Sequence, residues 1–168
     1  IGDTFSEWVT NIKGVPQGSI LSPLLFNIFI NDFLYLNIGS KTYNYADDNN
    51  LSYISSNLSE VTKTLEDDCV IAMEWFQANY MKANAEKFQL MFLSKQDTTY
   101  NQTLRINDKF IKSSSSINVL GIEIDSKLNF KIHIDDICNQ TSKQINVLKR
   151  IKLYLDKQCK NNLYNSYI

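Results

Sequence analysis

Two adjacent carboxylates, Asp47 and Asp48, are the residues of this chain best suited to carry chemistry. Mg²⁺ prefers one or two carboxylates together with the phosphate oxygens of a substrate, so such a pair suits nucleotidyl transfer. A bare Asp-Asp pair is more often a solvated turn, so the flanking residues decide. Residues 42–45 and 51–54 favour strands, which predicts a hairpin with residues 47–50 at its tip. We therefore expect both carboxylates at an exposed turn.

A loop with two glycines precedes the first expected helix. Gly14 and Gly18 would let the backbone approach a ligand closely, with Ser22 as the helix N-cap and Pro23 at the first helical position. Apolar residues between positions 25 and 34 recur at helical intervals and are expected to pack under the sheet. An ordinary capped helix explains the same features, and both interpretations remain open.

Two motifs of this sequence, one after the other along the chain, resemble motifs of the reverse transcriptase of non-LTR retrotransposons. These are mobile elements of the long-interspersed type. The segment from Pro16-Gln17-Gly18-Ser19 to Phe26 resembles the family's motif B, and Tyr45 to Asp48 resembles its Tyr-x-Asp-Asp motif C. Group II intron enzymes tend to have a second glycine after Gln-Gly, so Ser19 favours the mobile-element branch. The resemblance continues almost to the last residue.

The resemblance implies an α+β fold. Residues 1–130 would be the C-terminal part of a polymerase palm (motifs B to E), an antiparallel sheet backed by two helices, and residues 131–168 the beginning of a helical thumb. It also implies RNA-directed DNA synthesis with Mg²⁺, or Mn²⁺, held by Asp47 and Asp48. The implied partners are an RNA template, a DNA primer, a dNTP and other domains of a parent polyprotein.

The resemblance assigns roles to further residues. Gln17, Gly18 and Ser19 would lie beside the incoming nucleotide and the template base, and Tyr45 would position the turn. Lys87, with Lys82 as the second candidate, would protonate the leaving pyrophosphate, and Gly121 would approach the primer strand. The chain has Phe88 where the family commonly has Thr, and Val119 where an aromatic residue is frequent. A surface lysine and a β-bulge glycine are the alternatives for Lys87 and Gly121.

Positive charge is concentrated in the last segment. Residues 131–168 carry seven basic and three acidic residues, whereas residues 1–130 carry ten and fifteen. Apolar residues from Ile134 to Leu155 follow helical spacing, and Lys149, Arg150 and Lys152 lie on other faces, where they would contact a nucleic-acid backbone. His133, the only histidine, is expected to be structural.

The middle of the chain predicts further elements. Residues 57–60 resemble a capping box before a helix of about five turns. Its acidic run, residues 66–68, is expected to be solvated and not a metal site. We also expect a strand at 88–93, a hairpin at 104–112 and a strand at 117–125.

The sequence also leads to expectations about the cellular compartment of the protein and about whether the chain is part of a longer one. The chain lacks a signal peptide pattern, its longest apolar run is too short to span a membrane, and its three cysteines are expected to be buried and reduced, so a nuclear or cytoplasmic and not a secreted protein is expected. We expect the chain to begin downstream of a strand that bears a further catalytic Asp, and hence to be inactive alone. The alternative is a non-catalytic, nucleic-acid-binding or structural remnant.

Overall fold

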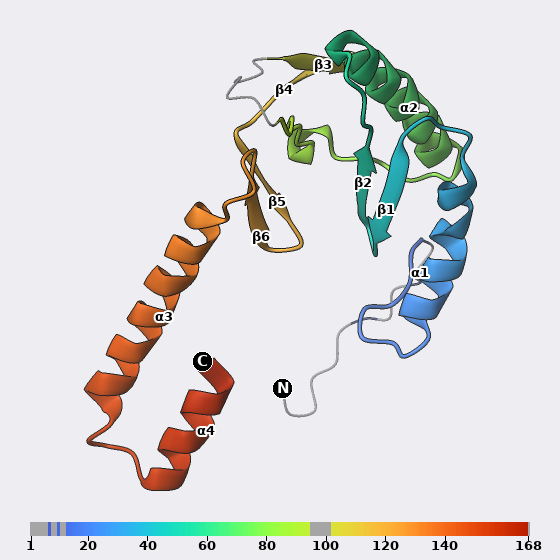
Figure 1. The fold of residues 1–168 in the computed structure, drawn as a ribbon. Coiled ribbons are helices and arrows are strands. Elements are labelled where there is room, and N and C mark those ends of the chain that lie inside the picture. The colour runs from blue at the N-terminus through green and yellow to red at the C-terminus, as the bar shows by residue number, and fades with distance from the viewer. Residues whose placement is uncertain (1–6, 8–9, 11–12, 95–101, 168) are drawn as a thin grey trace. The chain divides into compact units, whose positions relative to one another are not determined.

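The structure is a computed structural model and describes residues 7, 10, 13–94 and 102–167. The chain forms two compact units: Ile1–Asn84 with Ile106–Asp108, and Ala85–Arg105 with Lys109–Ile168. Helices are combined with three two-stranded sheets, β1-β2, β3-β4 and β5-β6 (Figure 1). The fold is therefore mixed α and β with small sheets, as the sequence predicted at this coarse level.

In its described residues, the first unit contains two α-helices, one 3-10 helix and one hairpin. Its elements are α1 (Ser22–Ile30), the 3-10 helix η1 (Asn31–Tyr35), β1 (Lys41–Tyr45), β2 (Asp48–Ser52) and α2 (Leu58–Ala78). Figure 1 shows α1 and η1 leading into the hairpin, and α2 following it.

An aromatic cluster joins η1 to the end of α2. Phe33 is 1% exposed, and its ring stacks on Phe76 with centroids 5.1 Å apart and meets Trp75 edge-on at 5.3 Å. Ile30 and Ala72 complete the buried cluster. Aromatic pairs at this spacing add to the stabilisation from buried area, so the cluster is the core of the first unit.

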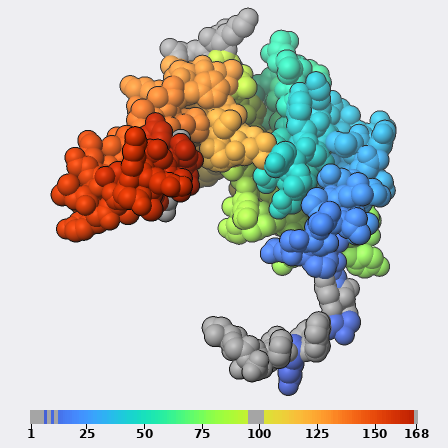
Figure 2. Space-filling model, turned by 90° about the horizontal axis from the view of Figure 1, so that it is seen from below, coloured from blue at the N-terminus to red at the C-terminus, as the bar shows by residue number. Residues whose placement is uncertain are grey.

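The expectation that the apolar residues of the first helix pack under the sheet is wrong. Ile30 and Phe33 are buried, but Leu25 and Leu34 remain 52% and 50% exposed. The buried residues meet the aromatic side chains of α2, which cover only one side of α1 and η1. In Figure 2 the blue atoms of α1 lie at the surface.

The start of α1 also differs from the prediction. Its N-cap is Leu21, and Ser22 is the first helical residue, so Pro23 occupies the second position. The buried Ser22 hydroxyl donates to the carbonyl of Pro16 at 2.7 Å. Ser22 therefore closes the preceding loop instead of capping the helix.

The start of α2 agrees with the prediction only in part. Asn57 is the N-cap, and its side chain accepts from the N–H of Ser59 at 3.0 Å. Glu60 does not return to the N–H of Asn57 as a capping box would; it accepts from the hydroxyls of Tyr53 and Ser55, each at 2.7 Å. Those two hydrogen bonds, Ser55 first, lower the pKa of Glu60.

Asp68 contradicts the prediction that the acidic run of α2 is solvated. Its carboxylate is 4% exposed and accepts from the N–H of Gly39 at 3.0 Å and of Ser40 at 2.7 Å. Gly39 is also tight, because a Cβ there would lie 2.9 Å from Cγ2 of Thr64. Asp68 thus fixes the backbone immediately before β1.

The second unit contains short strands followed by two helices. The elements after α2 are η2 (Ala85–Lys87), β3 (Thr103–Ile106), β4 (Lys109–Lys112), β5 (Ser116–Val119), β6 (Ile122–Asp125), α3 (Lys131–Ile151) and α4 (Lys157–Tyr167). The predicted hairpin at 104–112 is confirmed as β3 and β4. The predicted strand at 88–93 is wrong in its described residues, because only a single bridge joins Leu90 to Ser113.

The predicted single strand at 117–125 is also wrong. Residues 116–125 form an antiparallel hairpin in which Val119 pairs with Ile122 around the turn Leu120–Gly121. Both turn residues have positive φ, 52° for Leu120 and 82° for Gly121, which is the backbone that tight two-residue hairpins require. Gly121 is a turn residue, so its β-bulge alternative is wrong.

The three cysteines are free, but only one is shielded from solvent. Burial is the first cause that raises the pKa of Cys69 to about 11. Cys138 and Cys159 are exposed on α3 and α4, so the expectation of buried thiols is wrong for them.

None of the helices in the described ranges is long and apolar enough to cross a membrane.

Candidate functional site

The turn between β1 and β2 carries the two carboxylates. Tyr45 pairs with Asp48 in antiparallel register, which leaves Ala46 and Asp47 as a two-residue turn. Ala46 has φ of 51°, the left-handed conformation that such a turn demands. The predicted tip at 47–50 was too long, because Asp48 is already the first residue of β2. Asp48, Asn49 and Asn50 pair with residues of β1, so the ladder continues up to the two-residue turn.

Side chains on the two faces of this hairpin differ in environment. Residues that pair across a ladder point to the same face, so Tyr45 and Asp48 share one face. Tyr45 is 65% exposed, and Asp47 and Asp48 are exposed as well. The opposite face carries Asn44 and Asn49, which are half-buried. The carboxylates are thus open to a ligand arriving from solvent.

The carboxylate pair fits a hard divalent cation that also binds substrate. Mg²⁺ is commonly held by one or two carboxylates while phosphate oxygens and waters complete its shell. Within the described part of the chain, no three or more His, Cys, Asp or Glu side chains are grouped so as to hold a metal ion. Asp47 and Asp48 would therefore supply part of a shell and not a closed protein cage.

The loop before α1 forms a tight turn of its own. Ser19 N–H donates to the carbonyl of Pro16 at 3.4 Å, with Gln17 and Gly18 at the centre. Gly18 has φ of +83°, as the third residue of a type II turn requires, and no atom lies within 4 Å of where its Cβ would stand. The positive φ at position 18 therefore favours glycine there, whereas there is enough space for a side chain. Gln17 and Gly18 are exposed at the tip, whereas Ser19 is half-buried.

The hydroxyl oxygen of Ser19 has a local partner. It accepts from the N–H of Leu21 at 3.3 Å and so helps to shape the approach to α1. The turn that bears Asp47 and the loop before α1 belong to the same compact unit. That Gln17, Gly18 and Ser19 lie within reach of a ligand at Asp47 stays a prediction.

The other predicted site residues belong to the second unit. Lys87 is the last residue of η2, and Gly121 lies in the β5–β6 turn, where Asn118 Oδ1 accepts from its N–H at 3.0 Å. Lys149 and Arg150 occupy the last turn of α3, and Lys152 is its C-cap. All five positions are exposed, and their roles toward Asp47 or nucleic acid stay predictions.

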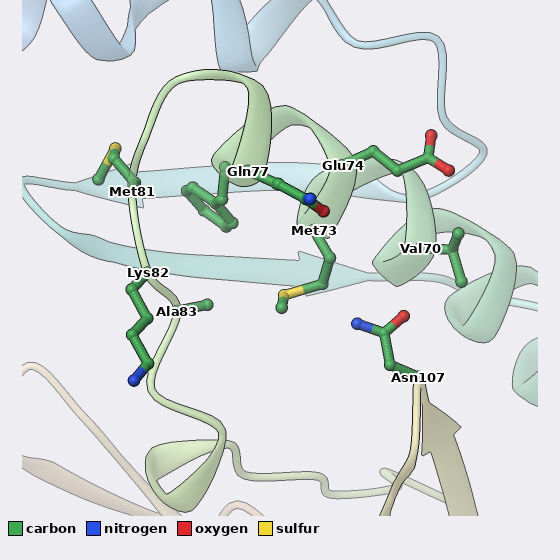
Figure 3. A pocket seen from close by; sticks show the side chains of 9 residues that line it. Val70, Met73, Glu74, Gln77, Met81, Lys82, Ala83 and Asn107 are labelled. Carbon is green, nitrogen blue, oxygen red and sulfur yellow. The ribbon is translucent and has the colours of Figure 1, made fainter.

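Lys82, the second candidate for the pyrophosphate-side lysine, borders a cavity in the first unit. The cavity has a volume of about 460 Å³ and is lined mainly by the end of α2, including Met73, Phe76 and Gln77, with Asn107 opposite. Figure 3 shows the Lys82 amine pointing away from the other labelled side chains. Neither Asp47 nor Asp48 lines this cavity.

His133 has the structural contact that was expected. The N–H of Glu123 in β6 donates to its Nδ1 at 3.4 Å, which ties the first turn of α3 to the hairpin. One ring nitrogen of His133 is therefore occupied by a local hydrogen bond.

Asp125 is a residue whose role the sequence analysis missed. Its 9%-exposed carboxylate accepts backbone N–H groups of Lys127 at 3.0 Å, Asn129 at 3.3 Å and Phe130 at 2.7 Å. Leu128 and Phe130 both have φ of 56°, so these hydrogen bonds stabilise a strained connection between β6 and α3. An Asp at a strand end followed by Ser-Lys and a helix was the available signal.

Replacing Asp125 with Asn should remove an acid-sensitive part of the stability. Burial acts to raise the pKa of Asp125, but the backbone hydrogen bonds outweigh it and hold the pKa below the ordinary value. A carboxyl with a depressed folded-state pKa stabilises the fold above its unfolded-state pKa of about 3.9, and this contribution is lost as pH falls. Urea unfolding should therefore separate wild type from Asp125→Asn at pH 7 and much less at pH 3. An unchanged difference would contradict this role.

Comparisons with known proteins agree with the motifs. Residues 3–124 match the family described as reverse transcriptase (RNA-dependent DNA polymerase). The RNA-directed DNA polymerase from mobile element jockey of Drosophila melanogaster is 27% identical over 167 residues, covering 92% of this chain and 18% of that protein.

Two further relatives come from other mobile elements. A probable RNA-directed DNA polymerase from transposon BS of Drosophila melanogaster is 26% identical over 162 residues, or 90% of this chain and 18% of that protein. A retrovirus-related Pol polyprotein from type-1 retrotransposable element R1 2 of Nasonia vitripennis is 27% identical over 145 residues, or 82% and 35%. No solved structure matches the chain.

The chain spans 35% or less of the length of these three relatives. The family match nevertheless covers most of its residues and includes both the Gln17–Gly18 turn and the Asp47–Asp48 turn. The motif-based resemblance is thereby confirmed, and the chain belongs to the reverse transcriptase (RNA-dependent DNA polymerase) family.

Proposed function

We propose that this chain is part of a retrotransposon RNA-directed DNA polymerase, with its catalytic carboxylates at the β1–β2 turn. The observation that carries the proposal is the exposed Asp47–Asp48 pair at a two-residue turn in a chain of this family. In the finer proposal, residues 1–130 are the C-terminal part of the palm and residues 131–168 the beginning of the thumb.

Asp47 would be a direct ligand of Mg²⁺ or Mn²⁺, and Asp48 a ligand or a support for one. When bound, the cations would activate the primer 3′-hydroxyl and offset charge on the triphosphate. Tyr45 shares a face with Asp48 and would orient the turn. The exposed Gln17 amide can donate and accept hydrogen bonds beside a template base, with Gly18 and Ser19 shaping the loop.

Roles for the second unit are proposed on family grounds and charge. Lys87 would give a proton to the leaving pyrophosphate, and Gly121 would approach the primer strand. An RNA template, a DNA primer and a dNTP are the proposed ligands, and other domains of a polyprotein the proposed partners. A nuclear or cytoplasmic site of action fits these ligands.

Primer extension tests the proposal directly. The 168-residue chain and an extended polypeptide, which adds whatever coding sequence precedes Ile1, would be assayed on an RNA template with Mg²⁺ or Mn²⁺. We expect extension only by the longer version, because Asp47 and Asp48 alone supply part of the negative charge that two cations and a triphosphate need. Extension by neither version, together with no cation binding, would contradict the proposed activity.

Charge reversal at the end of α3 should weaken nucleic-acid binding. Lys149, Arg150 and Lys152 are exposed and close in sequence, and each neutralised phosphate releases counterions. The triple change to Glu should reduce affinity for a primer–template duplex and flatten its salt dependence, measured by fluorescence anisotropy between about 50 and 200 mM salt. Basic residues at a helix C-terminus also complement its dipole, so helix content must be checked by circular dichroism. Unchanged affinity with intact helices would exclude this contact.

The second candidate function is nucleic-acid binding without catalysis. It is favoured by the excess of basic over acidic residues in 131–168, seven to three, which can attract phosphates without a catalytic site. Such a protein would bind a duplex with the same salt dependence in the presence of EDTA, and Asp47→Asn would leave its binding unchanged.

A further inference from the structure

The turn that bears Asp47 is tied down by a side chain of the next strand. Nδ2 of Asn49 donates to the backbone carbonyl of Asp47 at 3.1 Å. The preceding residue, Ala46, has φ of 51°, a left-handed conformation that few residues other than glycine adopt. Holding this carbonyl fixes the peptide from which the Asp47 side chain departs, so Asn49 limits where the carboxylate can lie.

A second asparagine faces Asn49 across the ladder. Asn44 and Asn49 are cross-strand partners, next to the Tyr45–Asp48 pair that closes the turn. Directly opposed residues have Cβ atoms about 4.5–5.5 Å apart, so the two amides are within mutual reach. The two amides nevertheless make no hydrogen bond with each other, so Asn44 is a cross-strand neighbour of Asn49 and not its hydrogen-bond partner.

The two asparagine amides reduce the stability of the fold at these positions. Within the described residues, both amide atoms of Asn44 and Oδ1 of Asn49 are buried and have no hydrogen-bond partner. An amide without a partner loses its hydration and gains nothing in return, and half-buried strand positions favour β-branched residues. Folding stability alone would favour valine or leucine at both positions.

We propose that Asn49 and Asn44 are positioning residues, which hold the carboxylate turn in the geometry for cation binding at the expense of fold stability. The inference rests on the proposed function, because it assumes that Asp47 binds a cation during nucleotidyl transfer. Asn49 acts through its hydrogen bond to the Asp47 carbonyl, and Asn44 acts as the side chain that stands beside Asn49 across the ladder. Strain or instability retained beside a reacting group is the pattern expected when precision matters more than stability.

Substitutions should therefore move stability and activity in opposite directions. Asn44→Val and Asn49→Leu remove the buried amides, so the melting temperature of the 168-residue chain should rise by about 2–4 °C. In the extended polypeptide the same changes should lower kcat for dNTP incorporation by about 10-fold, the scale typical of residues that orient metal ligands, with KM for primer–template unchanged. Asn49→Ser, which keeps a donor, should recover part of kcat. Thr42→Val on the same face is the matched control and should change neither quantity appreciably.

Measurements on the 168-residue chain separate this inference from the proposed function. In wild type, the backbone amide of Asp47 should give a high heteronuclear NOE, which reports picosecond to nanosecond order, and Asn49→Leu should lower it. Mn²⁺ should broaden the Asp47 resonance at lower concentrations in wild type than in Asn49→Leu. If neither the wild-type 168-residue chain nor the extended polypeptide binds Mn²⁺ or extends a primer, the proposed function fails. The NOE then still tests whether the hydrogen bond from Asn49 orders the backbone of Asp47.

Two results would overturn the positioning role. A lower melting temperature in Asn44→Val and Asn49→Leu, with activity lost in parallel, would make the asparagines ordinary structural residues. An unchanged NOE and unchanged kcat in Asn49→Leu would show that the contact with the Asp47 carbonyl does not position the turn.

Discussion

Replacing Asp47 with Asn is expected to abolish primer extension by the extended polypeptide. The amide is nearly the same size but carries no negative charge, so it binds Mg²⁺ far more weakly. Misplacement of reacting groups by about 1 Å can cost on the order of 10²-fold in rate, and loss of a direct ligand should cost at least that much. The measurement is the single-turnover rate of dNTP incorporation at saturating primer–template.

Asp108 offers a matched control for this experiment. It is also an exposed aspartate at the second position of a two-residue hairpin turn, here between β3 and β4. Asp108→Asn makes the same chemical change in the same kind of turn and should leave the rate unchanged. Equal losses in both variants, or no loss in Asp47→Asn, would remove Asp47 from the site.

Replacing Asp68 with Ala should destabilise the first unit by about 3 kcal/mol, since hydrogen bonds to a charged acceptor contribute roughly 1.5–3 kcal/mol and two buried N–H groups lose theirs. Gly39 and Ser40 would then be left without the carboxylate that fixes the start of β1. Urea unfolding followed by the fluorescence of Trp75, in a Trp8→Phe background, reports on this unit because Trp75 packs against Phe33.

The neighbouring Asp67 provides the comparison for Asp68. It lies on the same helix but is exposed, so Asp67→Ala should change the free energy of unfolding by no more than about 0.5 kcal/mol. Similar effects of both substitutions would mean that the buried hydrogen bonds of Asp68 contribute little.

The sequence predicts best what nearby residues determine. The hairpin around Asp47, the cap at Asn57 and the turn at Asn107–Asp108 all depend on a few consecutive side chains, and all three are present. The length of the first hairpin's tip was misjudged because Asn49 and Asn50 disfavour strands in isolation. Pairing with Asn44 and Tyr43 overrides that preference.

What the sequence did not predict depends on distant partners. Asp68 looks solvated beside Glu66 and Asp67, and its burial follows from backbone N–H groups 28 and 29 residues earlier in the chain. The apolar run at 88–93 has strand-like residues, but their pattern does not tell whether a partner strand lies alongside. Only Leu90 forms a bridge.

Gly121 is a local signal whose structural meaning was mispredicted. From the sequence it was expected within a single strand at 117–125, with a β-bulge as the alternative to a contact with the primer. The positive φ at both Leu120 and Gly121 instead reverses the chain.

The unequal environments of the three thiols allow the chain to be labelled without engineering. A maleimide reacts with the thiolate, and burial, which raises the pKa of Cys69 to about 11, keeps that sulfur almost wholly protonated and shielded at neutral pH. The Asp156 side chain, through its hydrogen bond and then its charge, also raises the pKa of Cys159. Cys138 is exposed on α3, so a limiting amount of dye should attach there first and place a fluorophore on the same helix as the proposed nucleic-acid contact, about three turns before it.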